Sequence, residues 1–199
     1  MNDIAVLIHG LGGTKLDMVP LKVRLKRAGF VTVSFGYLSV FRRIEPLANR
    51  LKEILIQLEN SASTRSIHIV GHSMGAIIAR AALADYQGSK IKSLLMLAPP
   101  NQGSHMARRL SPWFGWIVPT LDQLSDSPES YVNQLNQLEQ FKDLNLGIIE
   151  AKKDRVIARG KVRLQRDHDY HVIIGQHGIL TWYRKTGQLV EKYLATGRF

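Results

Sequence analysis

The segment Gly71-His72-Ser73-Met74-Gly75 limits the possible folds of this chain more than any other feature. A short apolar run at residues 67–70 precedes it, and an apolar, helix-forming run at residues 76–84 follows it. Glycine-x-serine-x-glycine between a strand and a helix is typical of a sharp turn that presents a serine at its tip. The backbone there is cramped, so the flanking positions must be small. We therefore predict that the Ser73 oxygen projects at the start of a helix, where developing negative charge is favoured.

A second glycine cluster lies near the N-terminus. The continuous apolar run at residues 4–8, typical of a strand buried on both faces, leads directly into His9-Gly10-Leu11-Gly12-Gly13. A serine that attacks a carbonyl needs two backbone N–H groups near the oxygen that becomes negative. Met74, the residue after the serine, would supply one, and Leu11 in the glycine-rich loop would supply the other. A phosphate-binding loop fits less well, because neither glycine-rich nucleotide pattern is present.

The chain as a whole alternates apolar runs with amphipathic segments, which predicts a parallel sheet covered by helices. We expect strands at residues 4–9, 31–35, 67–70, 93–97, 146–151 and 171–174. We expect helices near residues 20–28, 44–58, 74–86 and 189–195. The fold class is therefore α/β, and we expect one domain over residues 1–199, because a chain of this length can bury a sizeable core.

The two glycine motifs together resemble the α/β-hydrolase superfamily, and most closely its small lipases and esterases. Those proteins have a His-Gly-x-Gly-Gly loop and a Gly-His-Ser-x-Gly turn, as this chain does. The resemblance extends from residue 4 to residue 199. It implies a minimal α/β-hydrolase fold with about six mostly parallel strands, because the two strands that usually come first look absent. It also implies that an acid and then a histidine follow the serine along the chain.

His177 is the histidine that we favour as the catalytic base. Residues 171–175 read as the last strand and residues 176–180 as the loop after it, from which a base can reach the serine at the same edge of the sheet. The residues after His177 also resemble the family's terminal pattern of small and aliphatic residues before a last helix. His171, which would open the strand, is the alternative, and His168 reads as a solvated loop residue.

The remaining histidines precede any acid loop. We expect His9 and His72 to shape their loops by hydrogen bonding, and His68 to lie in the core within a strand.

Asp154 is the favoured acid. It follows the apolar run at residues 145–151, just past the expected penultimate strand, where family members commonly place this residue. Its role would be to hold the histidine tautomer and to stabilise the imidazolium. The plain alternative is a solvated carboxylate paired with the adjacent Lys and Arg side chains. Asp167 and Asp169 remain weaker candidates, and the earlier loop at residues 98–101 has no carboxylate.

Residues 101–140 break the alternation, because they contain three prolines and no convincing strand. The superfamily usually inserts a cap here, so we expect a short cap-like insertion. It contains a dense cluster of apolar side chains: Trp113, Phe114, Trp116 and Ile117. This cluster could be core beneath the cap, could line an acyl pocket, or could face a lipid surface, since Trp is common at such interfaces. We favour the acyl pocket.

The amino-acid composition excludes several other classes of protein. The chain has no Cys, so it has no disulfide, thiolate nucleophile or Cys-based metal site, and its histidines show no metal-binding spacing. We expect no metal and no cofactor. The N-terminus does not resemble a signal peptide, and no apolar stretch is long enough to span a bilayer. We therefore expect a cytoplasmic protein that could also lie peripherally at a membrane.

The net charge of +11 comes from 27 Lys and Arg residues against 16 Asp and Glu residues. Basic residues gather at residues 15–27 and 152–166. A solvated surface explains this charge most simply, and attraction to an anionic membrane or an acidic substrate is the sharper interpretation. Nucleic acid is not expected, because the basic runs contain no binding motif.

These features predict a serine hydrolase that cleaves carboxylic esters, of the esterase or lipase type, through an acyl-enzyme. The substrate would be a small-molecule or lipid ester. A thioesterase or acyltransferase with the same three residues is the alternative within the superfamily. A membrane-surface or partner-binding protein with a vestigial site is the alternative from another class.

Overall fold

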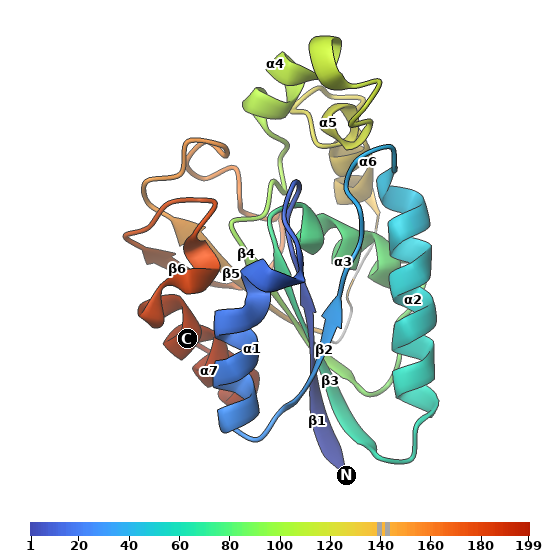
Figure 1. Ribbon diagram of the computed structural model, residues 1–199, viewed down its shortest axis with the longest axis vertical. Coiled ribbons are helices and arrows are strands. Elements are labelled where there is room, and N and C mark those ends of the chain that lie inside the picture. The colour runs from blue at the N-terminus through green and yellow to red at the C-terminus, as the bar shows by residue number, and fades with distance from the viewer. Residues whose placement is uncertain (139–140, 142–143) are drawn as a thin grey trace.

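A computed structural model describes residues 1–138, 141 and 144–199 of the chain. Within these residues one sheet of six strands has the order β2-β1-β3-β4-β5-β6, and each neighbouring pair is parallel (Figure 1). The strands are β1 (Asn2–Ile8), β2 (Val31–Phe35), β3 (Thr64–His72), β4 (Ile91–Leu97), β5 (Asn145–Ala151) and β6 (Asp169–Ile173). The expected α/β class and the six strands are confirmed, and the sheet is wholly parallel.

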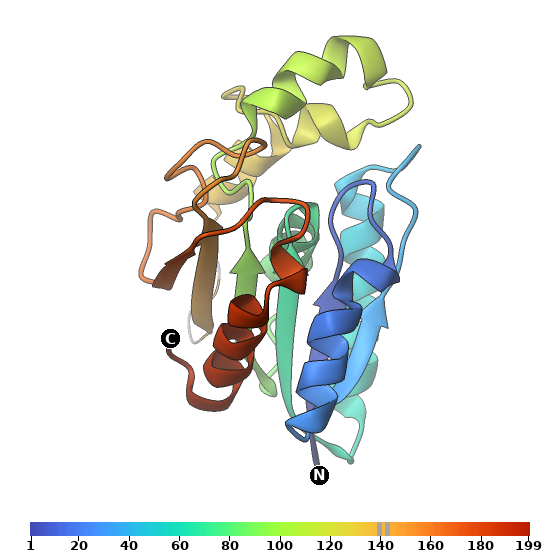
Figure 2. The same cartoon turned by 60° about the vertical axis from the view of Figure 1, so that its left-hand side comes forward.

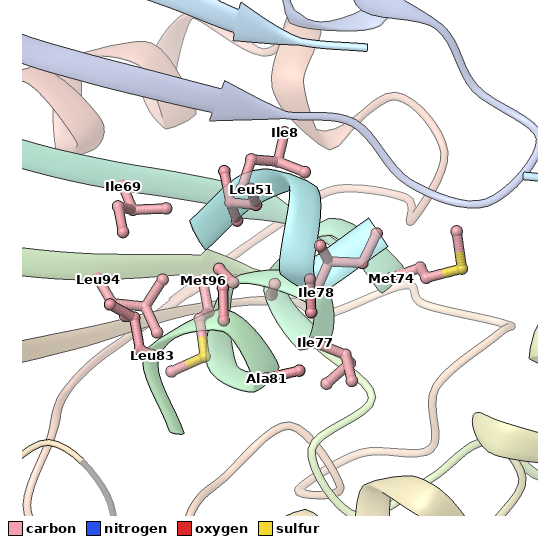
Figure 3. Close-up of a cluster of buried hydrophobic side chains, with 14 of the residues drawn as sticks. Ile8, Leu51, Ile69, Met74, Ile77, Ile78, Ala81, Leu83, Leu94 and Met96 are labelled. Atoms are coloured by element: carbon pink, nitrogen blue, oxygen red, sulfur yellow. The ribbon is translucent and has the colours of Figure 1, made fainter. Parts of the chain in front are cut away.

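The central strands are buried on both faces, as their continuous apolar runs predicted. Helices α1 (Val19–Arg27) and α7 (Arg184–Thr196) cover one face, and α2 (Ile44–Asn60) and α3 (Met74–Ala84) cover the other (Figures 1 and 2). Two apolar clusters, one on each side of the sheet, form the core. Figure 3 shows part of the larger cluster, where Leu51 of α2 and Ile77 and Ile78 of α3 lie near side chains of the strands.

Residues 101–138 form a cap beyond the carboxyl ends of the strands (Figures 1 and 2). Its helices are α4 (His105–Phe114), α5 (Thr120–Gln123) and α6 (Tyr131–Gln137). The described part of this insertion has no strand, as expected, although Ser104 and Ser125 form an isolated bridge. Residues 139–140, at the end of the predicted insertion, lie outside the described residues.

Two short 3-10 helices, η1 (Lys15–Met18) and η2 (Leu180–Trp182), lie after the first glycine-rich loop and after the His177 loop. None of the helices in the described part of the chain combines the length and the apolar character that a bilayer span requires.

Candidate active site

Ser73 sits in a strained turn between β3 and α3. Its backbone has φ 51° and ψ −121°, in a region that L-residues rarely adopt. The turn also brings the start of α3 against the end of β1: a Cβ on Gly75 would lie 2.4 Å from the carbonyl oxygen of His9 and 2.5 Å from that of Ile8. The second glycine of the motif is therefore required by a close approach of two backbones. The strand, sharp turn and helix that the motif predicted are all present.

The serine belongs to a chain of hydrogen bonds. His177 Nε2 lies 2.8 Å from Ser73 Oγ, and His177 Nδ1 lies 2.7 Å from Asp154 Oδ2. The Asp154 loop follows β5 and the His177 loop follows β6, while Ser73 follows β3. The carboxyl ends of parallel strands meet at one edge of a sheet, so residues 104 positions apart in the sequence come into contact.

Asp154 is held in one orientation. Its Oδ1 accepts hydrogen bonds from the backbone N–H groups of Val156 (2.7 Å) and Ile157 (2.9 Å), while Oδ2 faces His177. Burial acts against ionisation, but the hydrogen bond and charge of His177, together with the two N–H donors, lower the pKa of Asp154 below its ordinary value. The carboxylate is therefore ionised at neutral pH, and it is not a solvated surface residue.

His72 positions the loop that carries His177. Its Nε2 lies 3.0 Å from the backbone carbonyl oxygen of His177. Burial, followed by the nearby charge of His177, lowers the pKa of His72 to about 4. His72 is thus neutral at pH 7, with the proton on Nε2, where it donates to that carbonyl.

His9 shapes the first glycine-rich loop. Its Nδ1 lies 2.9 Å from the carbonyl oxygen of Gly10, and its ring stacks on Tyr37 at 4.1 Å between centroids. Tyr37 in turn donates its hydroxyl to the carbonyl oxygen of His9 (2.6 Å). Both histidines make loop-shaping hydrogen bonds of the kind that the sequence predicted.

Two backbone N–H groups in the loops beside Ser73 have no hydrogen-bond acceptor among the described residues. In the part of the chain that the structure describes, the N–H groups of Leu11 and Met74 have no acceptor, whereas Gly12 N–H donates to Ser39 Oγ at 3.0 Å. Met74 is the first residue of α3, and the first N–H groups of a helix have no partner within it. A Cβ on Gly10 would lie 3.2 Å from Cβ of Ser73, so the loop with Leu11 packs directly against the serine turn. This arrangement suits the stabilisation of an oxyanion.

The alternative candidates for the base and the acid make contacts outside the Ser73, His177 and Asp154 hydrogen-bond chain. His171 lies within β6 rather than at its start, since the strand begins at Asp169, and its ring contacts that of Phe199. Asp169 accepts a hydrogen bond from the backbone N–H of Phe199 (3.1 Å), and His168 Nδ1 lies 2.6 Å from the carbonyl oxygen of Arg166. Among the described residues no group of His, Asp and Glu side chains is placed to hold a metal ion.

His68 lies in the core, as expected. Its two ring nitrogens lie 2.8 Å from Ser93 Oγ and 3.0 Å from Ser66 Oγ. Asp167 is exposed.

The aromatic cluster of the cap is largely exposed. Trp113 and Trp116 are 76% and 77% exposed, and Phe114 is half exposed. The interpretation of these side chains as core beneath the cap is therefore wrong. Ile117 is partly buried, and its carbonyl oxygen accepts a hydrogen bond from Phe41 N–H (2.7 Å), which joins the cap to the loop after β2. Their part in an acyl pocket stays a prediction.

A parallel sheet with this strand order, and a serine on a strained strand–helix turn at its carboxyl edge, define a hydrolase of the α/β class. The sequence agrees with this class. Residues 5–173 match the model of the alpha/beta hydrolase family, and the chain belongs to that family. No curated protein has a matching sequence.

Solved structures with a similar fold include three hydrolases. Phospholipase PlaB from Legionella pneumophila has a TM-score of 0.75 and 15% identity, over 100% of this chain and 60% of that one. The mature lipase BlEst2 from Bacillus licheniformis has a TM-score of 0.73 and 14% identity, over 98% and 91% of the two chains. A structure from a study of carboxylesterases of the thaumarchaeon Nitrososphaera gargenis has a TM-score of 0.66 and 16% identity, over 98% and 91%. The chain thus spans less than two thirds of the phospholipase, and these likenesses show the fold.

Proposed function

We propose that the protein is a serine hydrolase that cleaves carboxylic esters. The observation that carries this proposal is the hydrogen-bond chain from Ser73 through His177 to the ionised Asp154. A serine hydroxyl is a weak nucleophile until a neighbouring base accepts its proton. The 2.8 Å contact between His177 Nε2 and Ser73 Oγ provides that base, and Asp154 holds the His177 proton on Nδ1.

The reaction would proceed in two halves. Ser73 Oγ attacks the ester carbonyl while His177 takes its proton, and the N–H groups of Leu11 and Met74 bind the oxyanion. The tetrahedral intermediate then collapses, the alcohol leaves with the proton from His177, and an acyl group stays on Ser73. Water, activated by His177, attacks the acyl-enzyme and releases the acid.

A thioester substrate, or an acceptor other than water, would use the same residues. Thioesterase and acyltransferase activity therefore stay as alternatives that differ only in the leaving group or in the acceptor. A binding protein with a vestigial site is a weaker proposal, because such a protein does not need an aligned base and acid together with two free N–H donors.

Labelling with a fluorophosphonate probe, together with a hydrolysis screen of esters and thioesters of increasing chain length, tests the proposal. Ser73→Ala should abolish labelling and lower kcat by about 10⁵-fold or more, while the fold survives. Ser63→Ala, at an exposed serine, is the matched control and should behave like the wild type. Undiminished ester hydrolysis by Ser73→Ala would disprove the role of this serine.

We also propose an anionic membrane surface as a partner, with a lipid ester as the substrate. The support is a set of exposed apolar side chains, Trp113 and Trp116 on the cap and Leu38 and Phe41 on the loop after β2. A hydrogen bond from Phe41 N–H to the carbonyl oxygen of Ile117 joins these two segments. Large exposed apolar surfaces mark interaction sites, and the net charge of +11 favours anionic lipids.

Sedimentation with anionic and neutral vesicles, at low and high salt, tests the membrane proposal. Binding should increase with anionic lipid content and weaken with salt, since each basic residue near the surface contributes about 1 kcal/mol. The contribution of Trp113 and Trp116 should be less sensitive to salt. A Trp113→Ser, Trp116→Ser variant should lose binding, whereas Trp182→Ser, at an exposed Trp outside the cap, should retain it. Absence of binding to both kinds of vesicle would leave a small soluble ester as the proposed substrate.

A further inference from the structure

Arg80 is a buried cation without a carboxylate partner among the described residues. It lies on the otherwise apolar helix α3 and is only 2% exposed. Its guanidinium donates to Asn101 Oδ1 (3.0 Å) and Asn136 Oδ1 (2.7 Å), while its Nε has no hydrogen-bond partner. Two neutral amides do not compensate a buried charge, and removal of a charge from water costs several kcal/mol. This charge requires a reason.

The two asparagines around Arg80 are fixed in place. Asn101 Nδ2 donates to the carbonyl oxygen of Val162 (2.7 Å), and Asn136 Nδ2 donates to the carbonyl oxygen of Asn101 (2.7 Å). These bonds leave both amide oxygens directed at the guanidinium. The surroundings of Arg80 are therefore preorganised and specific for a cation at this position.

A cavity of about 250 Å³ opens over Arg80, and two further arginines, Arg163 and Arg166, line it. The Arg163 guanidinium lies 3.8 Å from the centre of the Tyr170 ring, and Arg166 lies over the ring of Phe141 and donates to its carbonyl oxygen (3.3 Å). Aromatic rings and carbonyl groups orient a guanidinium without neutralising it. Both rim arginines are exposed, whereas Arg80 is buried.

The described lining of this cavity has three guanidinium groups and no carboxylate. Burial, followed by the charge of Arg166, lowers the pKa of Arg80 to about 9, so this guanidinium is still cationic at pH 7. The described residues thus bring three positive charges together at one cavity. An anion in this place would neutralise part of the positive charge.

We propose that this cavity binds a phosphate group. A carboxylate has one negative charge, whereas a phosphate monoester or inorganic phosphate carries close to two at neutral pH and has enough oxygens to accept from several arginines. The cavity would hold about eight water molecules, which leaves room for a phosphate group with a small organic substituent. This site is separate from Ser73, and its measurement does not depend on the proposed hydrolysis.

Titration calorimetry with inorganic phosphate, with the ionic strength kept constant by sodium chloride, tests the proposal. The wild type should bind phosphate saturably. Arg163→Gln and Arg166→Gln, both at exposed positions, should each weaken binding about tenfold or more, because each removes a charge-assisted hydrogen bond. Arg109→Gln, at an exposed arginine of the cap helix α4, is the matched control and should change the affinity less than twofold.

Two further probes identify the source of the phosphate group. Binding of glycerol 3-phosphate in solution supports a small soluble ester, and competition by phosphatidate vesicles but not phosphatidylglycerol vesicles supports a lipid headgroup. Absence of saturable phosphate binding to the wild type would overturn the proposal. An equal loss of affinity in Arg109→Gln and Arg166→Gln would also overturn it, because the effect would then reflect general charge.

Discussion

Replacement of Asp154 by Asn should reverse the tautomer of His177. Asp154 Oδ1 accepts from the N–H groups of Val156 and Ile157, at 2.7 and 2.9 Å, and only an oxygen can accept these bonds. The introduced asparagine must therefore direct its oxygen at the backbone and its NH2 group at His177 Nδ1. That nitrogen then has to accept, and the ring proton moves to Nε2, which faces Ser73 Oγ. His177 in this state cannot take the serine proton.

The size of the effect follows from the loss of the base. We expect kcat to fall about 10⁴-fold, which corresponds to about 5 kcal/mol of transition-state stabilisation. Stability at neutral pH should fall only by the contribution of the carboxylate charge, since both backbone hydrogen bonds remain. Asp154→Ala should differ, because it leaves two buried N–H groups without an acceptor, at a cost of about 1–3 kcal/mol each.

The pH dependence of stability gives an independent readout. The folded-state pKa of Asp154 lies below its ordinary value, so the unfolded chain binds this proton first. The carboxylate therefore contributes stability above the unfolded pKa of about 4, and this contribution is lost as the pH falls through the folded pKa. Asp154→Asn should lack this acid-sensitive contribution.

Steady-state hydrolysis of a chromogenic ester and urea unfolding measure both effects. Asp167→Asn, at an exposed aspartate, serves as the control and should keep normal kcat. A kcat for Asp154→Asn within tenfold of the wild type would refute the argument from tautomers. A large loss in Asp167→Asn instead would transfer the role of the acid to that residue.

His177→Ala should lose activity as Ser73→Ala does, while His171→Ala keeps most of its kcat; the opposite result in the same ester assay would make His171 the base. Between pH 7 and pH 4 the unfolding free energy of the wild type should fall by about 3 kcal/mol more than that of His72→Gln. The reason is that the unfolded chain protonates His72 near pH 6.5, whereas the folded protein protonates it only near pH 4. Urea unfolding at both pH values measures this, and an equal loss in both proteins would contradict the buried neutral state. Gly75→Ala should lower the melting temperature strongly, because its Cβ would overlap the backbone at the end of β1. Gly178→Ala is the control and should not lower it, because the space around Gly178 is open. Equal melting temperatures of the two variants would argue against this packing.

The buried parts of the fold could be predicted because burial on both faces produces apolar runs. The exposed β6 edge of the sheet and the start of α7 were harder to predict. Strand β6 is half buried and begins at Asp169 and Tyr170, so its first two residues give no apolar signal. Helix α7 begins at Arg184, five residues before the predicted start, because its first turn is polar and contains Gly187. A Cβ on Gly187 would lie 2.8 Å from the Arg24 side chain, a contact that local sequence does not report.

The candidate site was predictable in its residue types and order, but not in its supporting contacts. The motif and the order of serine, acid and histidine place Ser73, Asp154 and His177 on three loops. The N–H groups of Val156 and Ile157 could not be predicted as partners of Asp154, since any backbone offers such donors. A lone charge within the apolar run at residues 76–84 was a visible signal at Arg80. Its partners Asn101 and Asn136 lie 21 and 56 residues away, beyond what a pattern in one segment can show.

One turn helps to position both Ser73 and His177. The positive φ of Ser73 costs on the order of 1–3 kcal/mol, so the surrounding structure must enforce it. Ser73 N–H donates to the carbonyl oxygen of Leu97 in β4 (2.8 Å), and Ala76 N–H donates to the carbonyl oxygen of Ser73 (3.0 Å), which fixes the serine between the sheet and the buried helix α3. The preceding residue, His72, holds the His177 loop through the carbonyl of His177 itself. The sheet and one neutral histidine therefore both help to fix the distance between Ser73 and His177.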